Sequence, residues 1–394
     1  MKQLMVALAL IATPAGAETI SQEIARTGLG ATETRLEALR TPTDEELFAL
    51  GGVRFLGAVE QALQIRWRAG LTDRMGMLPF LRLPLPENSA PPPPQPRAIA
   101  DLFRGVAAGM DAARMPLSRI PETSDFGLVI ALDDLWFDIN ANGNRDAGED
   151  LLDVAGPMIL GFNWPGRGEA AGPVIRFDVA DAAWLSAYTH LLGGISDAVL
   201  AYDPTAAIDR LIRTRAGLAA LSTAPVEGAD ELGDYIDIAY AMIDALRQTP
   251  DKNRGLSAHA HFLNMIADNR AFWARVDRET DDDREWLPND RQHAALGVEV
   301  PPGTGKAWLA VLDDFEALLK GEKLAPYWRV GGDQAGIDVG QLFVNPRPVD
   351  LPGWIQGADA LPYLRKGPVV DGASWTAFEQ MAAGQAMLFS LFLN

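Results

Sequence analysis

Apolar side chains recur at helical spacing along most of this chain. Between residues 43 and 71 they lie three to five positions apart, which puts them on one face of a long helix: Leu47, Leu50, Phe55, Val59, Leu63 and Trp67. Thr43 and Glu46 have the spacing of a capping box at its start. Similar patterns predict helices at 20–40, 97–118, 181–200, with Asp181 as the N-cap, and at 205–222, 231–248, 256–278, 304–320 and 374–393.

Strand signals are short and few. Residues 174–177 (VIRF) read as a strand, and residues 124–139 combine apolar and aromatic residues with a mixed period that fits strand or helix. From about 321 to 373, Gly, Pro, Trp and short apolar runs replace the helical spacing, which indicates an irregular or partly β segment. We therefore expect a mainly α fold: a multi-helix body with that segment and a few short strands.

Proline marks the clearest boundary. Residues 84–96 include PENSAPPPPQP, and proline both fixes φ and lacks the N–H donor, so this stretch is expected to be an extended spacer. It separates an N-terminal helical segment (18–83) from a central helical region (97–250). A C-terminal helical region with an irregular cap follows at 251–394.

The first seventeen residues have the order of a secretory signal. One cation (Lys2) precedes an apolar run from Leu4 to about Ala12, and small residues stand at Ala15 and Ala17. The run is much shorter than the roughly 20 residues that span a bilayer. These features predict a signal peptide cleaved after Ala17, a periplasmic or secreted protein, and no transmembrane segment.

Charge and cysteine content narrow the function further. The 394 residues carry 53 acidic and 34 basic side chains, a net charge of −19. Such a surface repels nucleic acid and anionic lipid and favours cations or basic partners. The absence of cysteine excludes thiol nucleophiles and thiolate metal sites.

One segment has a spacing that indicates metal chemistry. Residues 138–149 (DINANGNRDAGE) place oxygen-bearing side chains where a twelve-residue calcium loop needs them. Calcium is a hard cation that takes six to eight oxygen ligands. Gly143 supplies the sharp turn. The candidate ligands are Asp138, Asn140, Asn142, the carbonyl of Asn144, Asp146 and Glu149.

The loop resembles that of EF-hand proteins and the D-x-N-x-N-G-x-x-D-x-G-E loops of extracellular calcium-stabilised modules. This resemblance covers twelve residues and implies Ca²⁺ as the cofactor. Arg145 stands where EF-hands usually have an aliphatic residue that pairs with a sister loop, and the chain has no second loop of this spacing. Both departures argue against a paired sensor and favour a structural ion. The stretch after the loop could be a helix, whereas the stretch before it could be a strand.

Three other patterns carry less weight. Residues 301–306 (PPGTGK) lack the first glycine and the final Ser or Thr of a phosphate-binding loop. His259 and His261 are two apart, so on a helix they cannot chelate one ion by themselves, and His190 and His293 are isolated in sequence. The acidic run 279–285 (ETDDDRE) is interpreted as a solvated helix end in preference to a weak cation site.

No recognisable catalytic constellation accompanies the loop. The leading hypothesis is a non-enzymatic exported protein, braced by calcium, that binds a partner such as another envelope protein or a polysaccharide. The aromatic and Arg-rich segments near 327–329 and 361–365 are where a partner surface is expected. The alternative is a calcium-stabilised exported hydrolase or lyase that uses Asp and Glu chemistry.

Overall fold

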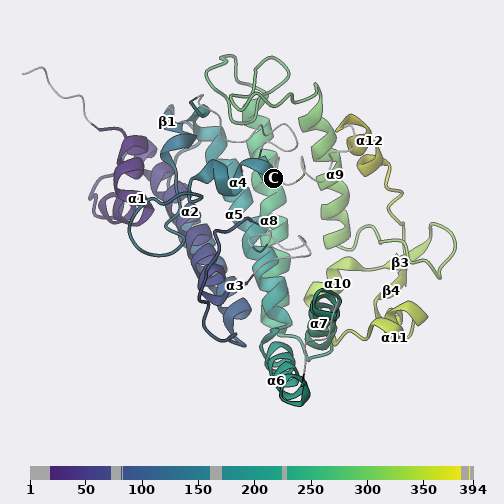
Figure 1. Cartoon of the computed structure of the whole chain (residues 1–394). Helices are drawn as coiled ribbons and strands as arrows, with labels where there is room; N and C mark the ends of the chain where they lie inside the picture. The colour runs from purple at the N-terminus through teal and green to yellow at the C-terminus, as the bar shows by residue number, and fades with distance from the viewer. Residues whose placement is uncertain are drawn as a thin grey trace, which may run out of the picture.

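The computed structural model describes residues 18–71, 81, 83–159, 171–223, 229–382 and 390 (Figure 1). This part of the chain is mainly helical, as predicted, with two small antiparallel sheets. The helices are α1 (Ile20–Glu37), α2 (Asp44–Ala69), α3 (Ala98–Leu117), α4 (Leu151–Ile159), α5 (Val179–Ala201), α6 (Thr205–Leu221), α7 (Ala229–Leu246), α8 (Lys252–Val276), α9 (Thr304–Leu319), α10 (Val339–Val344), α11 (Leu351–Gln356) and α12 (Ala373–Met381). The predicted signal peptide lies outside the described residues, as does most of the predicted helix beyond Ala382.

Three long helices, α3, α5 and α8, form the centre of the molecule (Figure 1). Helix α2 packs against α3, α1 against α2, and α9 against α8. One continuous cluster of buried apolar side chains runs through these layers and includes the fully buried Leu63, Phe103 and Phe272. None of the described helices is long and apolar enough to cross a membrane.

Glycine allows the central helices to approach closely. A Cβ added at Gly109 of α3 would lie 2.4 Å from the Cβ of Ala58 in α2. A Cβ at Gly194 of α5 would lie 2.9 Å from the ring of Phe262 in α8. Both distances are below normal van der Waals contact, so these positions accept no larger side chain without movement of the helices.

The helix starts follow the sequence signals with one correction. Thr43 and Glu46 form the predicted capping box of α2. Helix α5 begins earlier than predicted: Asp178 is its N-cap, and Asp181 is the partner three residues later that reaches back to the Asp178 N–H. The pair has capping-box spacing, so the cap lies one turn upstream of the residue that the pattern suggested.

Residues 84–96 form neither helix nor strand. The segment returns over the end of α2, where Asn88 Nδ2 donates to the Trp67 carbonyl at 3.0 Å. Arg66 Nη1 similarly donates to the Leu83 carbonyl at 2.8 Å. The core cluster contains side chains from both sides of this spacer.

Two sheets complete the fold. Strand β1 (Leu128–Ala131) pairs antiparallel with β2 (Val174–Phe177), and β3 (Ala335–Ile337) pairs antiparallel with β4 (Leu364–Lys366). A 3₁₀ turn, η1 (Leu132–Asp134), follows β1, and another, η3 (Leu361–Tyr363), precedes β4. The second sheet, α10 and α11 make up the irregular cap expected at 321–373, with a small apolar cluster of its own around Ile337, Ala360 and Tyr363.

Candidate metal centre

The ends of the 138–149 loop are clasped together. Trp136 forms an antiparallel bridge with Asp150, just before α4 begins. The Phe137 N–H donates to the Glu149 carbonyl at 2.8 Å, and the Leu151 N–H donates to the Leu135 carbonyl at 2.9 Å. The loop therefore enters from extended backbone after β1 and η1 and exits into a helix, which settles the question that the sequence left open.

Side-chain oxygens close the first half of the loop into a tight turn. The Asp138 carboxylate accepts the N–H groups of Asn142 and Gly143, each at 2.9 Å. The Asn140 Oδ1 accepts the Asn142 N–H at 3.0 Å. Gly143 has φ 76° and Ala141 has φ 58°, so both occupy the left-handed region. Gly143 thus makes the turn for which the sequence requires it.

Glu149 closes the far side from a buried position. Its side chain is fully buried. One carboxylate oxygen accepts the Ile139 N–H at 2.9 Å and the Asn140 N–H at 3.3 Å, and the other accepts the Asp146 N–H at 2.9 Å. Burial of an ionised carboxylate is costly unless its oxygens are bonded. These three amides supply such bonds but bring no positive charge.

Asp146 is the meeting point of the two asparagine side chains. Its Oδ2 accepts the Nδ2 groups of Asn140 and Asn142 at 2.8 and 2.7 Å. These two hydrogen bonds hold the pKa of Asp146 below its usual value. Asn144 joins through its main chain, whose N–H donates to the Asn142 Oδ1 at 2.7 Å. All six candidate ligand positions therefore belong to one hydrogen-bonded loop.

Helix α2 adds a carboxylate that sequence reasoning missed. Glu60 Oε2 accepts the Asp138 N–H, and Gln64 Nε2 donates to the Asp138 carbonyl, both at 2.8 Å. Burial raises the pKa of Glu60 to about 7, and the charges of Asp138 and Glu149 add to the effect. Glu60 lies 78 positions before Asp138, so no local pattern could have connected them.

Arg145, the residue that departs from the EF-hand pattern, is directed to the base of the loop. Its guanidinium pairs with Asp150, and Nη2 donates to the Asp133 carbonyl at 2.6 Å. The cation therefore fastens the loop to the chain before and after it. A role in strand pairing with a sister loop does not fit this position.

The donor set fits a hard cation by type, because every candidate ligand atom is an oxygen. Among the residues that the structure describes, no group of three or more Asp, Glu, His or Cys side chains has an arrangement that could hold a metal ion. The Nδ2 groups of Asn140 and Asn142 face Asp146, so both amides would have to rotate to present oxygen to an ion.

Comparison with known proteins adds no assignment. No family model, curated protein or solved structure matches this chain. The geometry of the loop and of the other polar clusters is therefore the basis on which a function can be proposed.

Two histidines that are far apart in sequence meet in the helical core. His190 of α5 and His261 of α8 have their Nδ1 atoms 2.8 Å apart. The Nε2 of His190 lies 3.9 Å from Asp268, and that of His261 lies 3.9 Å from Asp197. Burial, with a contribution from the nearby Arg114, lowers the pKa of both rings, that of His190 to about 3. Sequence reasoning treated His190 as isolated and considered His261 only together with His259.

The acidic run 279–285 is only partly solvated, which corrects the interpretation as a solvated helix end. Glu279 and Glu285 are half-buried and face the first turn of α5. Burial raises the pKa of Glu279 to about 7, helped by the charge of Asp178. Gln292 Nε2 donates to Glu279 at 3.2 Å. The cluster therefore crowds carboxyl groups beside α5 whose ionised forms are disfavoured by burial.

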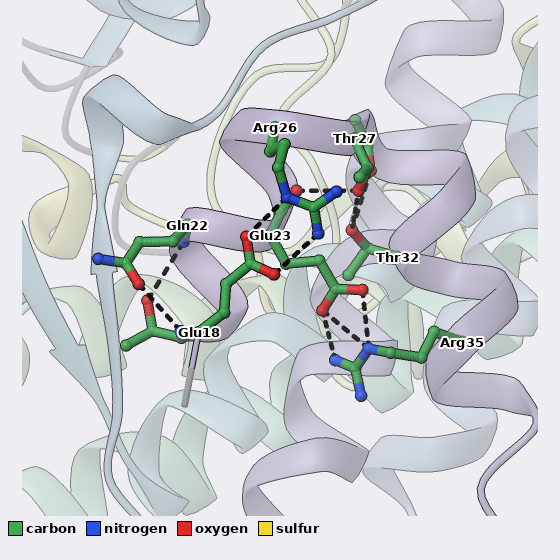
Figure 2. A network of polar contacts seen from close by, with 9 residues as sticks. Glu18, Gln22, Glu23, Arg26, Thr27, Thr32 and Arg35 are labelled. Carbon is green, nitrogen blue, oxygen red and sulfur yellow. Dashed lines mark hydrogen bonds and ion pairs between the residues drawn. The ribbon is translucent and has the colours of Figure 1, made fainter. Parts of the chain in front are cut away.

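A polar pocket of about 660 Å³ lies at the start of α1 and α2, beside β1. Figure 2 shows its charged wall, in which Arg26 pairs with Glu18 at 2.8 Å and Arg35 pairs with Glu23 at 2.7 Å. Each of these two carboxylates is thus engaged by an arginine. The carboxylates of this wall are therefore held in ion pairs, which does not suit them to act as a general acid or base.

The aromatic segment predicted as a partner surface is divided between core and surface. Trp354 stacks on Tyr363 with ring centroids 5.7 Å apart, and the Tyr327 hydroxyl donates to the Trp354 carbonyl at 2.5 Å. Trp328 is 70% exposed, with the Arg329 guanidinium 4.9 Å from its ring centroid. Most of these aromatics build the cap, and Trp328 remains available to a partner.

Proposed function

We propose that residues 138–149 bind one calcium ion through Asp138, Asn140, Asn142, the Asn144 carbonyl, Asp146 and Glu149. The observation that carries the proposal is the fully buried Glu149 carboxylate, which is held by three main-chain N–H groups inside a loop of oxygen donors. Glu60 places a further carboxyl group beside Asp138. The nearest arginine of the loop, Arg145, is paired with Asp150. A divalent cation would offset the negative charge of the loop carboxylates.

The attachments of the loop favour a structural role for the ion. Asp138 is fixed to α2 by Glu60 and Gln64, and the Trp136–Asp150 bridge joins the loop to the start of α4. An ion held between these points would brace α2, the β1–β2 sheet and α4 against one another. Single loops of this kind in extracellular modules bind calcium at about 10⁻⁴–10⁻³ M, which suits a permanent brace in a calcium-containing compartment.

The protein as a whole is proposed to be a non-enzymatic exported binding protein. The signal-like residues 1–17 support export, and the exposed Trp328 supports contact with an envelope protein or a polysaccharide. The carboxyl groups with raised pKa values line neither the polar pocket beside β1 nor the large apolar cavity beside α6 and α7; they are Glu60, Asp178, Asp181, Asp268, Glu279 and Glu285. This separation weighs against the alternative of a hydrolase or lyase.

Thermal unfolding with and without calcium tests the brace. At ten to a hundred times the Kd, bound calcium stabilises the folded state by about 1.4–2.7 kcal/mol, which raises the Tm by a few degrees. EDTA should reverse the rise. Asp138→Ala and Glu149→Gln should abolish it, because each removes a charged oxygen ligand. Glu299→Gln, at an exposed position outside the loop, is the matched control and should keep it. If calcium does not raise the Tm of the wild-type protein, the proposal is overturned.

A further inference from the structure

An apolar cavity of about 890 Å³ lies between the body and the pair of helices α6 and α7. Its inner wall comes from the end of α2, the start of α3 and the second half of α5. Its outer wall comes from α6 and α7, which stand apart from the central helices at the bottom of the molecule in Figure 1. The walls are mainly aliphatic and include Ile99, Val199, Ile208, Ile212 and Ile238.

The size of the cavity requires an explanation. Large contiguous apolar surfaces in contact with solvent are uncommon in folded proteins and usually mark a binding site. A space of about 890 Å³ falls in the range of ligand sites, which are roughly 300–1,000 Å³ and mostly apolar. The cavity is partly open to solvent, so its mainly apolar walls face water unless a ligand covers them.

The polar groups in the walls already have partners in the protein. The Tyr202 hydroxyl donates to the Arg347 carbonyl at 2.9 Å. Arg215 of α6 pairs with Asp234 and Asp237 of α7, at 2.7 and 2.5 Å. One guanidinium facing two carboxylates leaves this part of the site without an excess of positive charge. An anionic head group would therefore have to compete with both carboxylates for Arg215.

The outer wall is anchored at its base. The Asp251 N–H donates to the Ala201 carbonyl at 2.8 Å, which brings the residues before α6 and after α7 together. The Val349 N–H donates to the Leu246 carbonyl, also at 2.8 Å. Farther out, Arg215 ties α6 to α7 and leaves the apolar faces of both helices toward the cavity. The pair is thus attached to the body where the chain enters and leaves it.

We propose that this cavity binds one uncharged, lipid-like molecule with a long aliphatic chain. The aliphatic walls match such a chain, whose transfer from water into the cavity becomes more favourable with each CH₂ group. The Arg215–Asp234–Asp237 cluster selects a neutral head group over a carboxylate or phosphate. The site is separate from the calcium loop, since no lining residue belongs to 138–149.

Fluorescence of N-phenyl-1-naphthylamine, which brightens in apolar sites, tests the proposal on the full chain. The wild-type protein should bind the probe at one site and release it when 1-dodecanol is added. Laurate, with a chain of equal length and a negative head, should need a roughly tenfold higher concentration, equivalent to about 1.4 kcal/mol. Equal displacement by laurate and dodecanol would overturn the selection of a neutral head group.

Variants locate the probe. Ala198→Phe and Ala241→Phe fill the cavity from opposite walls and should weaken probe binding roughly tenfold or more. Ala219→Phe makes the same change at an exposed position of α6 outside the cavity and should bind as the wild type does. Circular dichroism checks that each variant folds, and either filled variant suffices. Equal binding by a folded filled variant and by Ala219→Phe overturns the proposal.

Two further measurements distinguish lipid binding in the cavity from calcium binding and from self-association. Asp138→Ala and EDTA should leave probe binding unchanged, so that a failed calcium brace and a failed lipid site give different results. Size-exclusion chromatography of the wild type and of Ala198→Phe tests a second copy of the chain as the occupant. A wild-type dimer that this substitution dissociates would overturn the lipid assignment.

Discussion

His190 and His261 share a short contact between their Nδ1 atoms, 2.8 Å apart, in the interface of α5 and α8. One ring must donate and the other accept, because two protonated nitrogens would repel each other at this distance. Gly193 makes room for the pair, since a Cβ there would lie 3.0 Å from the His261 ring. The interface is therefore built for a histidine pair with at least one neutral ring.

The first prediction concerns acid stability. Burial lowers the pKa of His190 to about 3 from an ordinary value near 6.5. As the pH falls from about 6.5 to 3, His190 takes up a proton in the unfolded chain but stays neutral in the folded chain. This site's contribution to stability is thus complete above about pH 6.5 and is lost as the pH approaches 3, with a slope of at most about 1.4 kcal/mol per pH unit.

Urea unfolding of His190→Gln between pH 7.5 and 4 checks this expectation. The variant should lose less stability on acidification than the wild type, whatever its stability at pH 7.5. His293→Gln, at a side chain that is 88% exposed, should follow the wild-type slope. Parallel curves for His190→Gln and wild type would show that the pair does not govern acid unfolding.

Glu279 should make the stability of the protein depend on pH in the opposite direction. Its pKa is raised to about 7, mainly by burial and further by the charge of Asp178. The folded state keeps this proton at pH values where the unfolded state has released it, so the contribution is present below about pH 4.5 and disappears as the pH rises through 7. Glu279→Gln removes the buried charge and should stabilise the protein at pH 8 by roughly 1–2 kcal/mol after allowance for solvent screening.

The check is the difference in unfolding free energy between pH 4.5 and pH 8. Glu279→Gln should gain on the wild type as the pH rises, whereas Glu299→Gln, at an exposed position, should not. A constant offset between Glu279→Gln and wild type at both pH values would contradict the assignment of a buried proton.

A third prediction uses two neighbouring residues with left-handed backbone, Ala141 and Gly143. Ala141→Gly should stabilise the loop and Gly143→Ala should destabilise it, each by about 1 kcal/mol, because a side chain in this region clashes with the backbone. Neither change removes an oxygen ligand. Chemical denaturation without calcium measures both, and effects of the same sign would refute the turn geometry.

Local signals were sufficient to predict most of the helical frame. Thr43 and Glu46 identify the start of α2 because a cap is made by residues three apart in one turn. The cap of α5 was misplaced because Asp178 and Asp181 are both acceptable caps, and only the strand before them decides which one is used. Residues 124–139 stayed ambiguous because β1 depends on pairing with β2, more than forty positions later.

In the candidate site, too, local patterns could be predicted from the sequence and long-range contacts could not. Residues 138–149 could be found from the sequence because their spacing is local. Glu60 and the His190–His261 pair could not, since each contact joins segments that are about seventy or more positions apart. Without related sequences, nothing in the chain marks such partners before the fold brings them together.

Helix α2 holds Asp138 by its main chain, through Glu60 on the N–H and Gln64 on the carbonyl, and leaves the carboxylate free of that task. The main-chain atoms of Asp138 thus attach the loop to α2, whereas its side-chain oxygens are the ones proposed to bind the ion. During evolution, a substitution at position 138 could change or abolish calcium affinity while the main-chain hydrogen bonds still attach the loop to α2. Conversely, substitutions at positions 60 and 64 could weaken the attachment of the loop to α2 while every ligand oxygen is retained.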